Sequence, residues 1–305
     1  MKLSIDFAFA GIEIIKKNPL AVLVWGLVYL AVSVVSSLVL VVMAGPALTA
    51  LQNYRTTPDA DPMQVFGYMG NLAPAYLILI VLGLVVAAII QCAVFRSQLQ
   101  PGEGGFASLK LGGDELRQIA VGILWALAFF LFYIVFGIAL AILIGIVSIV
   151  GQFSEIVAGI LIFLLVVGGI GAFLYIISRW SLAAVQSFAE KKINIFGSFK
   201  LTKGQGWKLL GGYLLLGLVM IVIAIIVYCL IFALMIGTSG GWTQAITQMS
   251  RPDFSSLSAL LTPIYLVQTL VSGLLMGGFY ALIYGASAAA YRALSDKGTQ
   301  SVDVF

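Results

Sequence analysis

Two short stretches of this sequence resemble sites that bind or activate a substrate. Residues 237–241 read GTSGG, which fits the G-x-S-x-G pattern of a serine nucleophile. That pattern needs a preceding strand and a histidine, and because the chain has no His, we do not expect Ser239 to react. Residues 203–208 read KGQGWK and lack the G-x-x-x-x-G-K-[ST] pattern of a phosphate-binding loop. They remain a candidate site for a lipid phosphate, bound by Lys203, Lys208 and the N–H groups that precede a helix.

The composition places both stretches in a membrane protein. With 62% hydrophobic and 9% charged residues among 305, the chain has more apolar surface than a soluble core could bury. Runs of about 20 or more uncharged apolar residues predict membrane-spanning helices, because backbone polar groups in hydrocarbon must be satisfied within their own segment. Six such runs occur, at 19–43, 74–95, 119–150, 156–178, 209–236 and 263–290.

The residue types on which most enzymes depend are missing from these runs. None contains Asp, Glu, Lys, Arg or His in its interior, which leaves no candidate for coupling transport to protons or sodium. A chain without His has no histidine general base, no HExxH zinc site and no His-ligated haem. A two-aspartate membrane protease also fails, since Asp59, Asp61 and Asp253 lie outside the runs. We therefore predict no catalytic residue, no metal site and no cofactor.

Lysine and arginine are distributed unevenly between the two sides of the membrane. Of the 16 basic residues, all except Arg55 and Arg251 fall on the side that holds both termini. The positive-inside rule makes that side, and both termini, cytoplasmic. The net charge of +4 is then concentrated at the cytoplasmic rim, where anionic headgroups attract it. Nucleic acid is not an expected partner, because no separate domain is left to bind it.

The six spans group into three helical hairpins, at about 1–96, 97–179 and 180–292 of one membrane domain that covers 1–305. A cytoplasmic tail follows at 293–305. Each hairpin ends in an arginine, which we expect to snorkel to the headgroups: Arg96, Arg179 and Arg292. The predicted fold class is therefore an all-α polytopic membrane protein of six transmembrane helices.

Each hairpin begins with a basic cytoplasmic segment, and two interpretations stay open: an ordinary juxtamembrane anchor that orients the following span, or part of a shared surface for lipid headgroups or a partner. We name these segments the first, second and third leaders, at 1–18, 97–118 and 180–208. FASLKL at 106–111 aligns with FGSFKL at 196–201, so the second and third leaders repeat one another. The repetition indicates a recurring structural part.

The last span has a small residue at every fourth position along one helical face. This spacing predicts close contact with another helix, since small side chains let two backbones approach in a membrane. We expect packing inside the bundle rather than a dimer interface. The stripe consists of Gly273, Gly277, Ala281, Gly285 and Ala289.

Residues 179–213 read RWSLAAVQSFAEKKINIFGSFKLTKGQGWKLLGGY and resemble a stretch found in a known group of proteins. An R-x-S-L-A exit, here Arg179 to Ala183, precedes a basic segment S-F-x-L-T-K-G-x-x-W-x-L-L, here Ser198 to Leu210. Both are similar to bacterial six-helix inner-membrane proteins related to the membrane domain of glycerophosphoryl diester phosphodiesterases. The resemblance implies an inner-membrane platform that handles or senses lipids, often beside another protein. The catalytic domain of those phosphodiesterases depends on histidines, which this chain lacks.

The expected function is that of a non-catalytic, lipid-associated platform or accessory subunit in the bacterial inner membrane. Two alternatives stay open: a channel or facilitator for an uncharged or lipidic solute, and the membrane subunit of an enzyme complex whose catalytic groups come from a partner. The expected ligand is anionic phospholipid, and a protein partner is left open. The residues expected at the headgroups are Arg96, Arg179, Lys191, Lys192, Lys200, Lys203, Trp207, Lys208 and Arg292.

Overall fold

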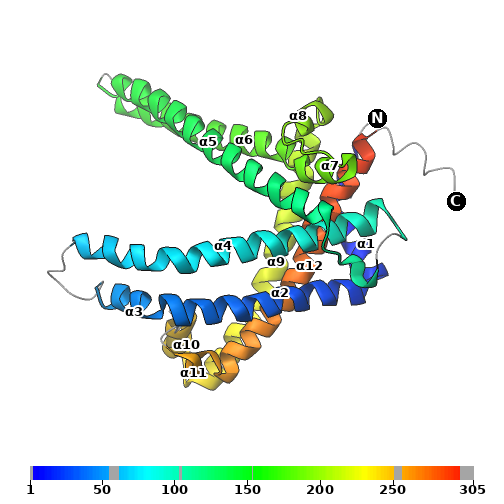
Figure 1. The fold of residues 1–305 in the computed structure, drawn as a ribbon. Coiled ribbons are helices and arrows are strands. Elements are labelled where there is room, and N and C mark those ends of the chain that lie inside the picture. The colour runs from blue at the N-terminus through cyan, green and yellow to red at the C-terminus, as the bar shows by residue number, and fades with distance from the viewer. Residues whose placement is uncertain (1–2, 55–61, 103–104, 153, 251–255, 296–305) are drawn as a thin grey trace.

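The structure, a computed structural model, consists of helices joined by short connections (Figure 1). Six helices are long and apolar enough to cross a membrane, and the described part of the chain contains no strand. The predicted fold class, an all-α polytopic membrane protein, is confirmed. The described residues are 3–54, 62–102, 105–152, 154–250 and 256–295.

Hairpin 1 is formed by α2 (Pro19–Val39) and α4 (Pro62–Leu99). A π-helical turn, Leu40–Ala44, joins α2 to α3 (Gly45–Tyr54). The prediction that the second span begins at Pro74 is wrong, because this proline lies inside α4. An interior proline removes one N–H from the helical ladder and its ring displaces the carbonyl of residue i−4, but membrane helices tolerate both effects.

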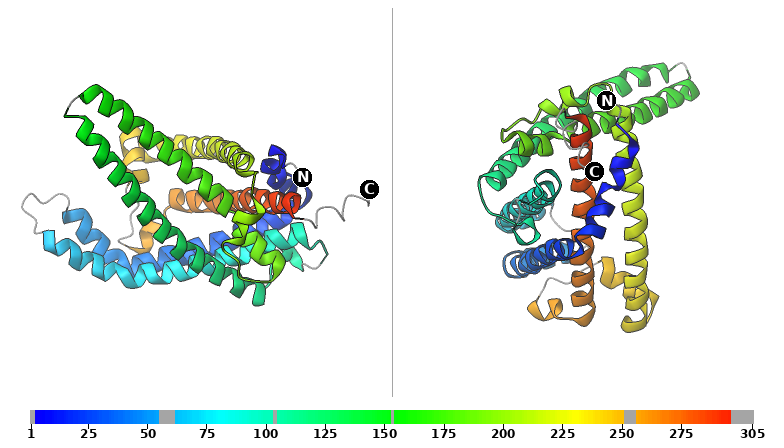
Figure 2. Two further views of the ribbon diagram at one scale, coloured as in Figure 1. Left: turned by 90° about the horizontal axis from the view of Figure 1, so that it is seen from above. Right: turned by 90° about the vertical axis from the view of Figure 1, so that its right-hand side faces the viewer.

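Hairpin 2 consists of α5 (Gly113–Val150) and α6 (Glu155–Trp180), which run side by side (Figures 1 and 2). Aromatic rings join them, since the Phe173 ring centroid lies 6.0 Å from that of Phe129 and 5.6 Å from that of Phe132. None of the residues in the most apolar 18-residue stretch of either helix is buried. Hairpin 2 therefore contacts the rest of the protein mainly near its leaders.

Hairpin 2 diverges from hairpin 1 as the two extend away from the leaders (Figure 1). The uncharged run of α5 at 119–150 measures about 48 Å at 1.5 Å per residue, and the uncharged stretch of α4 at 62–95 is longer still. Both exceed the hydrocarbon core of a bilayer, which is about 30 Å thick, so both helices must tilt to remain in hydrocarbon. Helix length therefore does not by itself explain the divergence.

Hairpin 3 begins with α9 (Gly206–Ser239) and ends with α12 (Pro263–Leu294). Two short helices, α10 (Trp242–Ser250) and α11 (Leu257–Leu260), lie between them. Helix α12 is central to the fold, because it contacts α2, α4, α9 and the first leader and packs most extensively against α2. The first leader is also helical, with a 3-10 turn at Ile5–Phe9 followed by α1 (Ala10–Lys17).

The small-residue stripe of α12 faces α2 and α1. A Cβ atom on Gly277 would lie 2.6 Å from both Gly26 N and Val22 O of α2. A Cβ atom on Gly285 would lie 2.6 Å from Ile14 Cδ1 of α1. The neighbours of Gly277 are backbone atoms, so no side chain fits there and glycine permits this approach of the helices. Of the other stripe members, Gly273 lies against Leu30, Ala281 is fully buried and Ala289 is half-buried.

We predict that Gly277→Ala destabilises the protein, whereas the neighbouring Gly278→Ala does not. The added methyl group at 277 would collide with the backbone of α2, and such overpacking costs about 1–3 kcal/mol. A Cβ atom at Gly278 meets nothing within 4 Å, so alanine there brings only its better helix propensity. Thermal unfolding of the two purified variants in one detergent measures the difference. Equal stability of the two variants would contradict close packing at Gly277.

Candidate functional site

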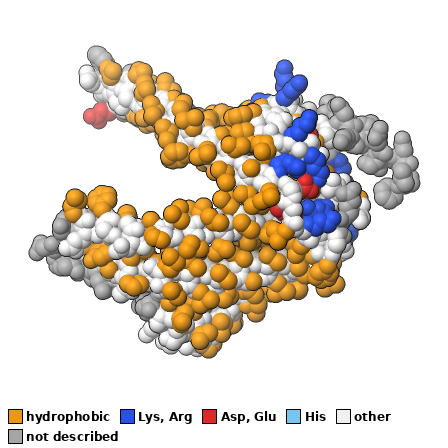
Figure 3. All heavy atoms as spheres, viewed as in Figure 1, with side chains coloured by type: hydrophobic (Ala, Val, Ile, Leu, Met, Phe, Trp, Pro, Cys, Tyr) orange, Lys and Arg blue, Asp and Glu red, His pale blue; other side chains and the backbone are white. Residues whose placement is uncertain are grey.

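The candidate site lies at the end of the molecule where the leaders gather. Figure 3 shows Lys and Arg side chains concentrated there, while hydrophobic side chains cover the rest of the visible face. The second leader contains a short 3-10 turn, Phe106–Ser108, and the third contains α7 (Ala183–Glu190) and α8 (Gly197–Leu201). We call this end the basic end.

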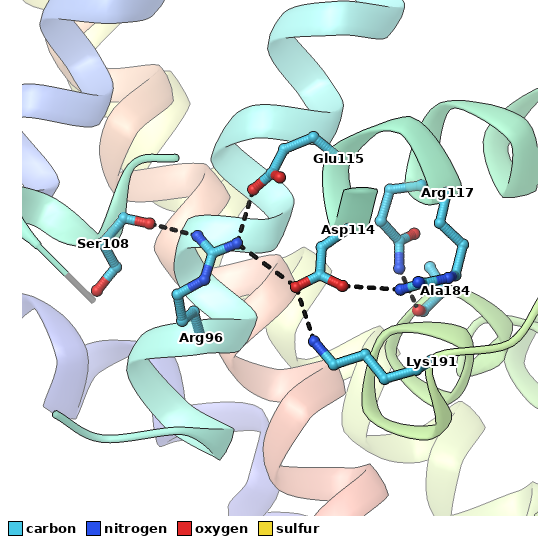
Figure 4. Close-up of polar contacts among 8 residues, drawn as sticks. Arg96, Ser108, Asp114, Glu115, Arg117, Ala184 and Lys191 are labelled. Atoms are coloured by element: carbon cyan, nitrogen blue, oxygen red, sulfur yellow. Dashed lines mark hydrogen bonds and ion pairs between the residues drawn. The ribbon is translucent and has the colours of Figure 1, made fainter. Parts of the chain in front are cut away.

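Arg96, in the last turn of α4, is buried at the junction between hairpins 1 and 2 (Figure 4). Only 3% of the residue is exposed. Its Nη2 donates to Glu115 Oε1 at 2.7 Å, and its Nη1 donates to the backbone oxygen of Ser108 at 2.6 Å. Since 3% of Glu115 is exposed, this is an ion pair removed from water. The expectation that Arg96 snorkels to headgroups is therefore wrong, because its charge is neutralised inside the protein.

Asp114 extends the ion pair into a network of five charged side chains. Its Oδ1 accepts from Arg117 Nη1 at 2.7 Å, and its Oδ2 accepts from Lys191 Nζ at 2.7 Å. The Nη2 of Arg96 lies 3.9 Å from the same Oδ2 (Figure 4). The network joins the end of α4, the start of α5 and the end of α7. Lys191, expected at the headgroups, is half exposed and paired with Asp114.

Helix termini explain why these charges stand where they do. Asp114 and Glu115 occupy the first turn of α5, where the helix dipole favours negative charge. Arg96 occupies the last turn of α4, where the dipole favours positive charge. The end of one helix thus meets the start of the next with complementary charges on both.

The second leader adopts an unusual backbone conformation beside Arg96. Ala107 and Ser108 both have φ of 54°, in the left-handed region that L-residues rarely occupy. The carbonyl oxygens of these two residues accept hydrogen bonds from buried donors: Trp25 Nε1 donates to Ala107 O at 2.9 Å, and Arg96 donates to Ser108 O. These bonds offset the cost of the left-handed residues and hold the leader against hairpin 1.

The third leader is held in a similar way by Arg179. This half-buried arginine donates from Nη2 to the backbone oxygen of Phe199 and from Nε to Thr202 Oγ1 at 3.1 Å. Trp180 Nε1 donates to the Ile195 backbone oxygen, as Trp25 does to the second leader. Each of the two arginines therefore fastens the leader that follows its hairpin.

These contacts follow the repeat seen in the sequence only approximately. Arg96 reaches a carbonyl 12 residues further along the chain, and Arg179 reaches one 20 residues further. Helix α7, which has 8 residues, lies between Arg179 and that carbonyl. In the alignment of the two leaders Phe199 corresponds to Leu109, so the two arginines bond to neighbouring rather than equivalent carbonyls.

The remaining predicted headgroup residues lie on or near the surface of the basic end. Lys192, Lys200 and Lys203 are exposed, Lys208 is half-buried, and Arg292 is exposed in the last turn of α12. The Trp207 residue is 74% exposed, although its ring contacts Tyr175 at 5.0 Å between centroids. The structure therefore brings most of the third leader's basic residues to the surface and takes Arg96 inside.

Two sets of residues were assigned no role from the sequence. One is the acidic pair Asp114–Glu115. A sequence signal for it exists, because these two acids begin a helix 18 and 19 residues after Arg96, which ends the previous helix. The other is Gln118, whose Nε2 donates to Ala184 O at 2.8 Å while its buried Oε1 has no partner. Gln118 fastens α5 to the third leader.

The GTSGG stretch has a structural explanation. It closes α9, and Gly240 is the C-cap with φ of 83°. Glycine is the residue that most readily adopts this left-handed conformation at a helix end. Within the described residues, no group of three or more Cys, Asp or Glu side chains is placed to bind a metal ion.

Comparison of the chain with protein-family models, curated proteins and solved structures finds no match. Fold and site define the class of the protein: an all-α, multi-pass membrane protein whose hairpins are joined at a basic end. The similarity of residues 179–213 to the phosphodiesterase-related membrane proteins stays a prediction.

We predict that Glu115→Ala destabilises the protein by about 3–5 kcal/mol, because it leaves the Arg96 charge buried without its closest partner. Glu13→Ala is the matched control. It breaks a pair with Lys17 whose side chains are 72% and 76% exposed, and such surface pairs contribute about 0–1 kcal/mol. Denaturant or thermal unfolding in detergent compares the two. A Glu115→Ala variant as stable as the control would show that the buried pair is dispensable.

Proposed function

We propose that this membrane protein binds anionic phospholipid headgroups through its third leader and acts as a non-catalytic platform or accessory subunit. The observation that supports this most directly is the exposure of Lys192, Lys200 and Lys203 on one leader beside exposed apolar rings. A lysine near an anionic membrane surface contributes about 1 kcal/mol of attraction.

The apolar side chains of the leader favour a membrane surface over water. Ile193, Phe196 and Trp207 are 52%, 59% and 74% exposed. Aromatic rings are enriched where headgroups meet hydrocarbon, because one side of the ring stays apolar while polar atoms reach water. Lysines among such rings are typical of segments that bind at this interface.

The contacts beneath the leader support a preformed binding surface. Arg179 bonds to Phe199 and Thr202, and Trp180 stacks on Phe196 with ring centroids 5.6 Å apart. A surface whose backbone is already fixed loses less conformational entropy when a ligand binds. The leader therefore presents its lysines from a defined conformation.

A bacterial inner-membrane location, both termini in the cytoplasm and a protein partner belong to the same proposal. They are supported by the distribution of 16 basic residues and by the similarity of residues 179–213 to lipid-associated membrane proteins. In this arrangement, the basic end faces the cytoplasmic leaflet.

We predict that replacing Lys192, Lys200 and Lys203 by Gln weakens binding of phosphatidylglycerol on the order of a hundredfold at low salt. The loss follows from three contributions of about 1 kcal/mol each. Native mass spectrometry of the purified protein, titrated with phosphatidylglycerol, measures it. Phosphatidylcholine, which carries no net charge, should bind equally well to both proteins.

The control replaces three lysines on the other two leaders, Lys16, Lys17 and Lys110, by Gln. It removes the same charge from the same end of the molecule and should weaken binding less than tenfold. Equal losses in the two variants would mean that only overall charge matters. Unchanged binding in the Lys192, Lys200 and Lys203 variant would contradict the headgroup proposal.

A further inference from the structure

An open wedge separates hairpins 1 and 2. Figure 3 shows it as a hollow between α4 and α5, narrow toward the basic end and wide at the other end, with hydrophobic side chains along both sides. The two helices meet near its narrow end, where a Cβ atom on Gly122 would lie 3.8 Å from Leu84 Cδ2. We call this hollow the wedge.

The depth of the wedge follows from helix geometry. Leu84 precedes Arg96 by about 18 Å along α4 at 1.5 Å per residue, and Arg96 lies at the basic end. Half of a bilayer's hydrocarbon core measures about 15 Å. With the basic end at one membrane face and α4 along the membrane normal, the narrow end of the wedge would lie near the middle of the membrane and its wide part in the opposite leaflet.

The α4 wall of the wedge is bulky. Residues that share the helical face of Leu84 toward the wide end are Val81, Ile80 and Leu77, spaced by three, four and seven residues. They are 60%, 56% and 63% exposed. Helices that pack against one another in membranes use small residues at the contact, and none of these four positions holds one.

The α5 wall changes from small to bulky along the same direction. Gly122 shares its face with Ala126, Phe130 and Tyr133. The last two residues are 62% and 58% exposed. The two helices are in ordinary van der Waals contact at Gly122, and beyond it the bulky residues of both walls are exposed. The wedge is therefore lined by apolar side chains that the rest of the protein does not cover.

We propose that the wedge binds the acyl chains of a membrane phospholipid from the leaflet opposite the basic end. Its walls are uncharged and apolar at hydrocarbon depth, so water is excluded and hydrocarbon chains are the complementary ligand. The bulky walls disfavour a second copy of the protein as the occupant. This inference extends the proposed function from the headgroups of phospholipids at the basic end to their acyl chains in the wedge. It rests on the proposed function only in taking the ligand to be a phospholipid.

The test places a photoreactive benzophenone amino acid at Phe130 in the wedge or, as a control, at Val135. Val135 is also exposed, at 59%, and lies about 140° further around α5. Both proteins are reconstituted in vesicles of equal parts phosphatidylethanolamine and phosphatidylglycerol, extracted in detergent, washed extensively and irradiated. Mass spectrometry then identifies the adducts.

We expect phospholipid adducts at position 130 to exceed those at 135 severalfold after washing, because lipid in the wedge exchanges slowly. Equal yields at the two positions would overturn the proposal, as would adducts at 130 with a peptide of a second copy. The Lys192, Lys200 and Lys203 variant should keep the adduct at 130. If the adduct at 130 is missing but phosphatidylglycerol binding still depends on the three lysines, only the wedge site is rejected. If the adduct is present but phosphatidylglycerol binding does not depend on these lysines, only the headgroup site is rejected.

Discussion

A guanidinium that is removed from water must be neutralised and hydrogen-bonded, and Arg96 imposes this constraint on the junction between two hairpins. Its partners come from the second leader and the start of α5. The leader must therefore return to the end of α4, and it does so through two left-handed residues whose carbonyls accept bonds from Arg96 and Trp25. Arg179, which is half-buried, also donates to a backbone carbonyl, that of Phe199 in the third leader. The basic end is thus the part of the molecule that polar interactions hold together.

Away from that end, the hairpins depend mainly on shape, although the Ser37 and Tyr265 hydroxyl groups form a hydrogen bond of 2.6 Å between α2 and α12. Hydrocarbon gives no hydrophobic driving force for helix association, so close packing needs small residues. Helix α12 has them and lies against α2 and α1 with backbone atoms in near contact. Hairpin 2 meets α4 at Gly122, but none of the most apolar 18-residue stretch of α5 or of α6 is buried, and the hairpin diverges from hairpin 1 in Figure 1. A protein whose hairpins are joined at the basic end and separate away from it is suited to holding lipid, so the proposed function and the wedge are compatible.

Much of the fold could be predicted from the sequence because membrane insertion leaves a strong compositional pattern. Uncharged runs located the helices, and the four-residue spacing of small residues indicated the contact face of α12. The burial of Arg96 could not be predicted, since an arginine that ends an apolar run is typical of a residue at the headgroups. Its partner Glu115 lies 19 residues away, across a leader whose path depends on the contact itself. The start of α4 could not be predicted from Pro74 for a related reason: the residues on both sides of this proline are helical, so the helix continues through it.

The separation of hairpins 1 and 2 is the central claim, and a distance measurement between spin labels in lipid nanodiscs tests it most directly. Native Cys92 and Cys229 are replaced by Ala and Ser, and labelled cysteines are introduced in pairs. One pair, Val81→Cys with Ala126→Cys, lies near the narrow end of the wedge, and the other, Phe66→Cys with Ile142→Cys, lies far from it. The account predicts a clearly longer distance for the second pair. Equal distances, or a shorter one for the second pair, would show that hairpin 2 packs along hairpin 1 in the membrane and would contradict the account.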